Sequence, residues 1–254
     1  MREVLGVALH ALNQDSKRLE AVAVNLANVS TPGYKRTIAV AQSFGEMIDG
    51  FASVAGPTRA NGVEVPLPPL SMHVDLQAGT LKFTGRELDF AISGKGFFEV
   101  MTPDGPAYTR TGDFSLDASG RLLAPQGHPV MGREGEIRLP PVSLRVDRAG
   151  NVFDATDTQQ TSRPLAQLKV VNIEDQRVQQ RLDSGYLVLD SVPADLPTGS
   201  ISVKQGYLEN ANVSAMREML EMMATVRHVE TLQKVVNGYD EMMATAVRKL
   251  GEGN

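Results

Sequence analysis

The chain has 254 residues, of which 42% are hydrophobic and 22% are charged, and its formal net charge is −5. These proportions are typical of a soluble globular protein with one or two domains, and the acidic balance without a basic tract argues against nucleic acid as a main ligand. The absence of cysteine excludes disulfides, thiolate metal sites and cysteine nucleophiles.

No run of 18 apolar residues is present, so we expect no membrane-spanning helix. The first nine residues briefly imitate a secretory signal peptide. However, Asp15, Lys17, Arg18 and Glu20 follow where a signal peptide would carry apolar or small residues. We therefore expect no cleaved signal peptide.

The first predicted element is a helix over about residues 3–28. Its apolar positions alternate spacings of three and four, as in a heptad seam interrupted by Asp15; they are Leu5, Ala8, Leu12, Leu19, Val22 and Leu26. The helix should end before Pro32, which disfavours helical geometry at Thr31, and Gly33, which tolerates a positive φ. A seam of this kind predicts pairing with another helix, and an ordinary helix docked on its own domain is the alternative.

Residues 37–70 mix apolar residues with helix and strand breakers, among them Gly56, Pro57, Pro66, Pro68 and Pro69. This composition predicts an irregular linker. An unstructured segment of this length is unusual inside a compact domain, so we expect it to become ordered against neighbours.

Residues 71–207 carry turn signals every eight to twelve residues, at positions 102–105, 117–120, 125–127, 132–135 and 147–151. Short stretches with strand composition lie between and beyond them, at 96–101, 108–111, 113–116, 168–173 and 185–189. This pattern predicts a central antiparallel β domain.

A second striped helix is predicted over about residues 213–250, with Asn212 as the N-cap and Ser214 as the alternative. Its apolar seam positions are Met219, Met222, Val226, Val229, Val236, Met243, Val247 and Leu250, and Gln233 and Asp240 are the polar members. Met216, Leu220 and Met223 widen the apolar face, which indicates more than one neighbour. Polar seam residues such as Asp15 and Asp240 can set helix register at a cost in stability.

The sequence contains no pattern that indicates a catalytic site. Gly94-Lys95-Gly96 lacks both the leading glycine and the Ser or Thr of a phosphate-binding loop, so a glycine turn is the better interpretation. The four histidines, at positions 10, 73, 128 and 228, share no metal-ligand spacing, and the aspartates at 104, 113 and 117 suit turns. We therefore predict no enzyme activity, no cofactor and no metal site.

Four stretches carry a resemblance to a known family: Asn25–Arg36 (NLANVSTPGYKR), Leu88–Phe98 with Tyr108–Phe114, Ala124–Gly132, and Asn210–Ser214. They resemble the signatures of the bacterial flagellar rod and hook proteins. Within that family the chain looks most like the proximal rod type, with the distal rod and hook proteins as alternatives.

The resemblance implies a structural subunit of the flagellar basal-body rod. In this family the terminal helices pair into a tube around the export channel, the β domain lies outside, and the assembly transmits torque. The implied partners are further copies of the chain, neighbouring rod proteins and the flagellar export apparatus, with no nucleic acid and no small-molecule substrate. The implied location is the periplasm-spanning basal body, reached without a cleaved signal peptide.

The expected fold is therefore mainly β with α-helical termini that pair as a coiled-coil layer. The expected parts are an N-terminal assembly helix and signature turn (1–36), an arm (37–70), the central β domain (71–207) and a C-terminal assembly helix (208–254). The expected assembly interface comprises the apolar seam positions of both helices together with Asn28, Pro32, Gly33, Tyr34 and Asn212. An enzyme or glycan-binding β domain with helical dimerisation ends is the alternative from another class.

Overall fold

The computed structural model describes residues 2–41, 70–156, 163–173, 178–181, 185–189, 193–197, 199 and 201–251. The chain divides into two compact units. The first, here called the helical unit, combines Met1–Ala27, Thr37–His73 and Ser214–Asn254. The second, here called the β unit, combines Asn28–Arg36 and Val74–Val213.

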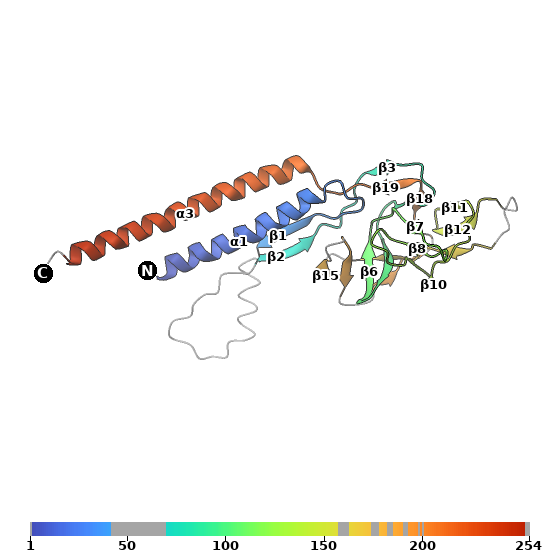
Figure 1. The fold of residues 1–254 in the computed structure, drawn as a ribbon, viewed down its shortest axis with the longest axis horizontal. Helices are drawn as coiled ribbons and strands as arrows, with labels where there is room; N and C mark the ends of the chain where they lie inside the picture. Colours follow the sequence, from blue (N-terminus) through green and yellow to red (C-terminus); the bar gives the residue numbers. More distant parts are fainter. Residues whose placement is uncertain are drawn as a thin grey trace. The chain divides into compact units, whose positions relative to one another are not determined.

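The helical unit contains α1 (Arg2–Ala27), α3 (Ala215–Gly251) and the paired strands β1 (Thr37–Ala41) and β2 (Leu70–Val74). Figure 1 shows α1 and α3 side by side, with β1 and β2 along α1. Hydrogen bonds join Asn25 to Glu218 and Asp15 to His228, so residue numbers rise along α1 as they fall along α3. The two helices are therefore antiparallel.

Both predicted terminal helices are confirmed, with ends displaced by one or two residues. The prediction of Asn212 as the N-cap was wrong. Because α3 begins at Ala215 and Glu218 N donates to Ser214 O at 3.0 Å, the capping position belongs to the alternative, Ser214. The amide of Asn212 is used within the β unit instead.

The β unit is built from antiparallel pairs throughout its described part. A six-stranded sheet has the order β15 (Val178–Arg181), β16 (Leu187–Leu189), β6 (Gly105–Thr109), β5 (Phe97–Thr102), β14 (Val170–Asn172), β17 (Ala194–Asp195). A three-stranded sheet contains β11 (Leu144–Val146), β12 (Asn151–Asp154) and β13 (Ala166–Gln167). The two-stranded pairs are β3 (Leu81–Phe83) with β19 (Tyr207–Glu209), β4 (Phe90–Ile92) with β18 (Val203–Gln205), β7 (Ser115–Leu116) with β8 (Leu122–Leu123), and β9 (Met131–Gly132) with β10 (Gly135–Glu136).

The core of the β unit is aliphatic with a few aromatic rings. Phe90, Phe98 and Phe114 are fully buried, and the ring of Phe114 lies 5.9 Å from that of Phe90 and 5.3 Å from that of Phe98. The turns close as their composition predicts: Oδ1 of Asp117 accepts hydrogen bonds from the backbone N of Ser119 and of Arg121, both at 2.8 Å. The predicted antiparallel β architecture is confirmed.

The predicted arm lies mostly outside the described residues, which omit 42–69. Its first five residues form β1, and its last residue opens β2. The domain boundaries drawn from the sequence stay a prediction.

Candidate assembly surfaces

Asn25 joins three segments of the helical unit. It lies in the last turns of α1, and its Nδ2 donates to Thr37 O of β1 at 2.8 Å and to Glu218 Oε2 of α3 at 3.0 Å. In return, Thr37 N donates to Asn25 Oδ1 at 2.8 Å. Asn25 and Glu218 are both buried, so their polar atoms depend on this arrangement.

Asp15 forms a second polar contact between the two helices. Its carboxylate is buried, with 2% of the side chain exposed, and lies 2.5 Å from Nδ1 of His228 and 3.6 Å from Nη1 of Arg18. A groove of about 420 Å³ opens beside this contact. Its lining is Asp15, Arg18, Ala39, Glu221, Ala224, Thr225 and His228.

The sequence-predicted seam of α1 faces the interior of the helical unit in part. Ala8 and Val22 are buried, and Leu12, Leu19 and Leu26 are half-buried. The side chain of Leu5 lies outside the described part of the chain.

On α3 the buried positions are displaced by one residue from part of the predicted seam. Met222, Val229 and Val236 are half-buried, but Glu218 and Thr225 are buried where Met219 and Val226 were expected. The buried carboxylate of Glu218 accepts a hydrogen bond from Asn25, which offsets part of the cost of its burial. The side chains of Met243, Val247 and Leu250 lie outside the described residues.

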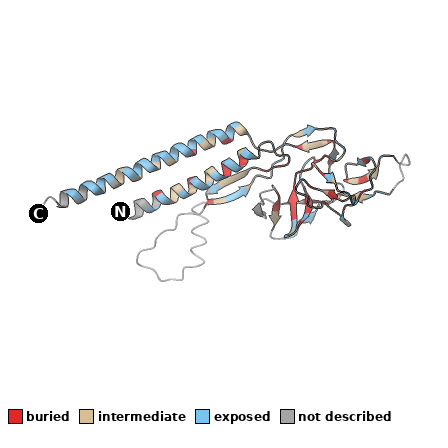
Figure 2. Ribbon diagram, in the orientation of Figure 1, coloured by how far each residue is buried: buried red, intermediate tan, exposed pale blue. Residues whose placement is uncertain are grey.

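A large apolar surface therefore stays exposed on α3, and most of this helix is drawn in the exposed colour in Figure 2. The exposed fraction reaches 75% at Met216, 63% at Leu220 and 56% at Met223. We call this surface the outer α3 face; its members are Met216, Met219, Leu220, Met223 and Val226. A contiguous exposed apolar surface is characteristic of an interaction site.

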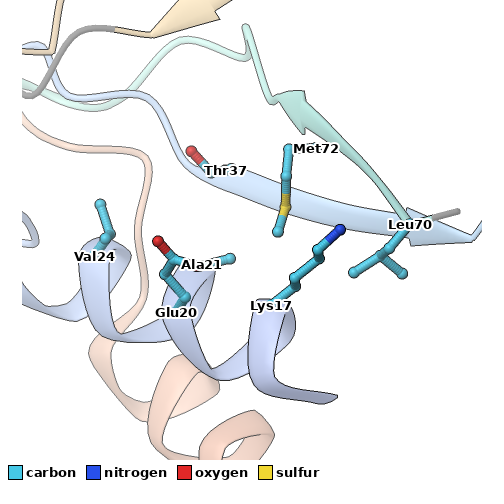
Figure 3. Close-up of a pocket in the computed structure, with 7 residues that line it drawn as sticks. All are labelled: Lys17, Glu20, Ala21, Val24, Thr37, Leu70 and Met72. Carbon is cyan, nitrogen blue, oxygen red and sulfur yellow. The ribbon is translucent and has the colours of Figure 1, made fainter. Parts of the chain in front are cut away.

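A groove of about 330 Å³ lies between α1 and strands β1 and β2 (Figure 3). The α1 helix contributes two charged residues, Lys17 and Glu20, and two apolar ones, Ala21 and Val24. The strands contribute Thr37, Leu70 and Met72 from the facing side. We call it the α1/β1–β2 groove.

The signature turn, Asn28–Arg36, belongs to the β unit. Gly33 has a φ of +68°, and its N donates to Glu209 O at 2.7 Å. A Cβ on Gly33 would lie 2.3 Å from the carbonyl carbon of Arg110, so only glycine fits there. Pro32 O accepts a hydrogen bond from Thr111 Oγ1 at 3.2 Å, and the ring of Tyr34 is buried.

One buried carboxylate, Glu209, secures this turn. Oε1 accepts from Lys35 Nζ and from Gly79 N, both at 2.7 Å, and Oε2 accepts from Arg110 Nη1 at 2.8 Å. Burial lowers the pKa of Lys35 from its ordinary value, and Glu209 opposes this by favouring the ammonium form. Burial likewise lowers the pKa of Arg110. The sequence analysis did not predict this cluster. The one feature that could have indicated it is the position of Glu209 directly before the C-terminal signature, Asn210–Ser214.

Asn212 completes the same region. Its Oδ1 accepts from Arg36 N at 2.6 Å, and its Nδ2 donates to Asp75 O at 2.9 Å and to Gln77 O at 3.1 Å. Asn28 closes the start of the turn by accepting from Thr31 N at 3.1 Å. Gly33, Tyr34 and Asn212, predicted at an interface between copies, thus make these contacts within one chain.

The described residues contain no group of three or more His, Asp or Glu side chains placed to hold a metal ion. Across the same residues, no helix is both long and apolar enough to cross a membrane. Gly94 and Gly96 adopt positive φ values of 104° and 128°, so the glycine-turn interpretation of residues 94–96 is confirmed.

Comparison with known proteins links this architecture to one family. Three family models match: "Flagella basal body rod protein" over residues 5–35, "Flagellar hook protein FlgE/F/G D1 domain" over 91–154, and "Flagellar basal body rod FlgEFG protein C-terminal" over 204–249. The flagellar basal-body rod protein FlgF of Salmonella typhimurium is 32% identical, over 93% of this chain and 92% of that protein. FlgG of Buchnera aphidicola (subsp. Schizaphis graminum) is 30% identical over 94% and 96%, and FlgG of Bacillus subtilis is 30% identical over 91% and 92%. The chain therefore belongs to the family of flagellar basal-body rod proteins, which are structural proteins rather than enzymes.

Proposed function

We propose that this chain polymerises through α1 and α3 into the axial shaft of the flagellar rod, which surrounds the export channel and transmits torque. The observation that carries this proposal is the outer α3 face. Burying one large aliphatic side chain contributes about 1.5–3 kcal/mol, so a face of five apolar residues represents a substantial driving force for association. A face of this kind on a rod-family subunit is best explained by contacts with further copies.

The two antiparallel helices of one chain would form the repeating element of a coiled-coil layer. Each copy would use one surface to contact the next and a different surface to accept the previous one. Such heterologous contacts generate an open helical assembly when they do not close into a ring. The predicted parts then have distinct roles: residues 1–36 and 208–254 assemble, 37–70 form the arm, and 71–207 form the outward β domain.

Neighbouring rod proteins and the flagellar export apparatus are the partners that this function requires, and the site of action is the basal body. We favour the proximal rod position on the sequence resemblance; relatives named FlgF and FlgG match at 32% and 30% identity. Expressing this chain in a strain that lacks FlgF and in a strain that lacks FlgG would distinguish the proximal from the distal rod position. Restored swimming in only one strain would assign the position.

The self-association of the full chain tests the proposal. Size-exclusion chromatography with light scattering should show mass that increases with protein concentration. The Met219→Glu, Met223→Glu double variant should stay monomeric, because glutamate on the outer α3 face opposes burial. A matched control, Arg217→Glu, Val235→Glu, changes two exposed positions of the same helix that lie outside the outer α3 face, and it should still associate. A strictly monomeric unsubstituted chain at all concentrations would contradict the proposal.

A further inference from the structure

We propose that the outer α3 face of one copy docks in the α1/β1–β2 groove of a neighbouring copy, in one defined antiparallel register. This inference rests on the proposed function and specifies the contact by which copies meet. It commits to a second copy of this chain as the occupant of the groove. Two apolar surfaces on the same chain and a matched spacing of charges support it.

The two surfaces can both be occupied while the helix pair stays intact. With 3.6 residues per turn, the groove residues of α1 lie about 140° around the helix from Asp15, Val22 and Asn25, which face the interior. The outer α3 face lies about 140° from Glu218 and Thr225 by the same geometry. The contact between copies would therefore add to the contact within the chain rather than replace it.

The charged residues of the groove and of α3 have complementary order and equal spacing. On α1, Lys17 precedes Glu20 by three residues, and Val24 follows four residues later. On α3, Met223 precedes Arg227 by four residues, and Glu230 follows three residues later. All six residues are exposed.

An antiparallel alignment brings all three pairs together at once. It opposes Val24 with Met223, Glu20 with Arg227 and Lys17 with Glu230, because each pair of numbers sums to 247. A parallel alignment that opposes Glu20 with Arg227 places Lys17 opposite Ala224 and Val24 opposite Thr231. Only the antiparallel arrangement therefore gives one apolar and two oppositely charged contacts.

Because α1 and α3 are antiparallel within each chain, α3 of one copy is also antiparallel to α1 of a second copy that has the same orientation. Copies stacked in one direction can therefore form this contact. The flexible thioethers of Met219 and Met223 suit an irregular groove lined by Ala21, Leu70 and Met72. Glu20 and Lys17 at the groove would fix the register that apolar contacts alone leave open.

The register also predicts how neighbouring copies are displaced. In an antiparallel pair of helices, the residue numbers of facing positions add up to a constant. That constant is 243 within the chain, as for Asp15–His228 and Asn25–Glu218, and 247 for the proposed contact between copies. The two alignments therefore differ by four residues. At 1.5 Å per residue, neighbouring copies would be offset by about 6 Å along the helix axis. A displacement of this kind makes the contact open-ended, as a shaft requires.

Disulfide trapping tests the register directly, because the chain contains no cysteine. Full-length Val24→Cys and Met223→Cys variants are mixed, allowed to assemble and mildly oxidised. A disulfide needs Cα atoms within about 7 Å, so covalent dimer should exceed that of the control mixture by about tenfold. The control pairs Val24→Cys with Val235→Cys, an exposed α3 position outside the outer α3 face. Each single variant oxidised alone measures background.

Charge reversal provides the second measurement. Glu20→Arg alone and Arg227→Glu alone should each weaken self-association by about fivefold, because each places like charges opposite one another. The double variant should recover most of that loss. Assembly without the 24–223 disulfide, or without recovery in the double variant, overturns the proposed contact and leaves the rod function standing. If the unsubstituted chain does not assemble at all, the proposed function fails and this contact fails with it.

Discussion

Lys35 and Glu209 lie 174 residues apart in the sequence, and their side chains form a buried ion pair with 2.7 Å between Nζ and Oε1. Arg110 approaches the other oxygen of the same carboxylate at 2.8 Å. One acidic residue thus joins the signature turn, the loop after β6 and the end of β19. The signature motif is anchored by a residue far outside it.

Replacing Glu209 with glutamine should destabilise the β unit strongly. The change removes the negative charge and leaves Lys35 and Arg110 as buried cations, which typically costs about 3–5 kcal/mol. Urea unfolding of the full chain, followed by far-ultraviolet circular dichroism, measures the loss. Glu136→Gln is the control, because its pair with Arg138 is largely exposed and should be worth less than about 1 kcal/mol. Equal effects of the two substitutions would show that the buried cluster has no special role.

Gly33→Ala should destabilise the signature turn by more than its φ value alone explains. The new Cβ would meet Arg110 and Thr111 backbone atoms at 2.3 Å, and the backbone must move to accommodate it. Gly127→Ala is a matched control, because Gly127 has a similar φ of +82° and open space around its Cβ position. We expect about 1 kcal/mol for the control and at least about twice that for Gly33→Ala. Thermal unfolding of both variants checks the difference, and a control as damaging as Gly33→Ala would rule out the steric explanation.

Asp113→Asn should stabilise the chain at neutral pH. Burial raises the pKa of Asp113 above its ordinary value, and the nearby Asp89 adds to the effect. The folded state therefore holds the proton more tightly than the unfolded state, so Asp113 lowers stability as the pH rises from the ordinary value of 3.8 through the higher folded pKa.

The amide has no proton to lose and stays uncharged, so its advantage should develop as the pH rises through that range and disappear below pH 3.8. The free energy of unfolding of both proteins, measured from pH 3 to pH 8, tests this sign. Asp104→Asn, at an exposed turn position, serves as the control for replacing an aspartate with asparagine. An advantage that stays constant across the whole range would contradict the electrostatic explanation.

His228→Ala should loosen the contact between α1 and α3. Among the described residues, Asp15 would keep the more distant Arg18 as its partner, and a buried carboxylate that loses its hydrogen-bond partner costs about 1–3 kcal/mol. Hydrogen exchange should become faster in α1 around residue 15 and in the facing turn of α3. Lys234→Ala, at an exposed position on the same helix, should leave exchange in α1 unchanged. Unchanged protection in His228→Ala would mean that the apolar contacts alone hold the helices.

The helices, turns and strand-rich centre could be predicted because they depend on local spacing and composition. Pro103 and Asp104 turn the chain between β5 and β6, and Asp117 bonds to backbone groups two and four residues away. The α3 positions that face α1 could not be predicted in full. Hydrophobic periodicity selected Met219, whereas a hydrogen bond from Asn25, 193 residues away, turns Glu218 inward.

The cluster around Glu209 escaped prediction for the same reason. Its three charged members come from segments whose pairing is set by the tertiary fold, and a lone acidic residue on a strand has no distinguishing pattern. Met216, Leu220 and Met223 were predicted to widen the apolar face of α3 toward a second neighbour; they are exposed in the single chain, and the second neighbour stays a prediction.

The separation between Asn25 and Glu218 also determines the order in which the chain can fold. A ribosome releases α1 before α3, so the contact between the helices cannot form until the β unit between them has been made. The strands of the β unit all precede α3 and can pair before that moment. During this interval the surface of α1 that faces α3 has no native partner in the nascent chain, and a holding chaperone would have its longest opportunity to bind there.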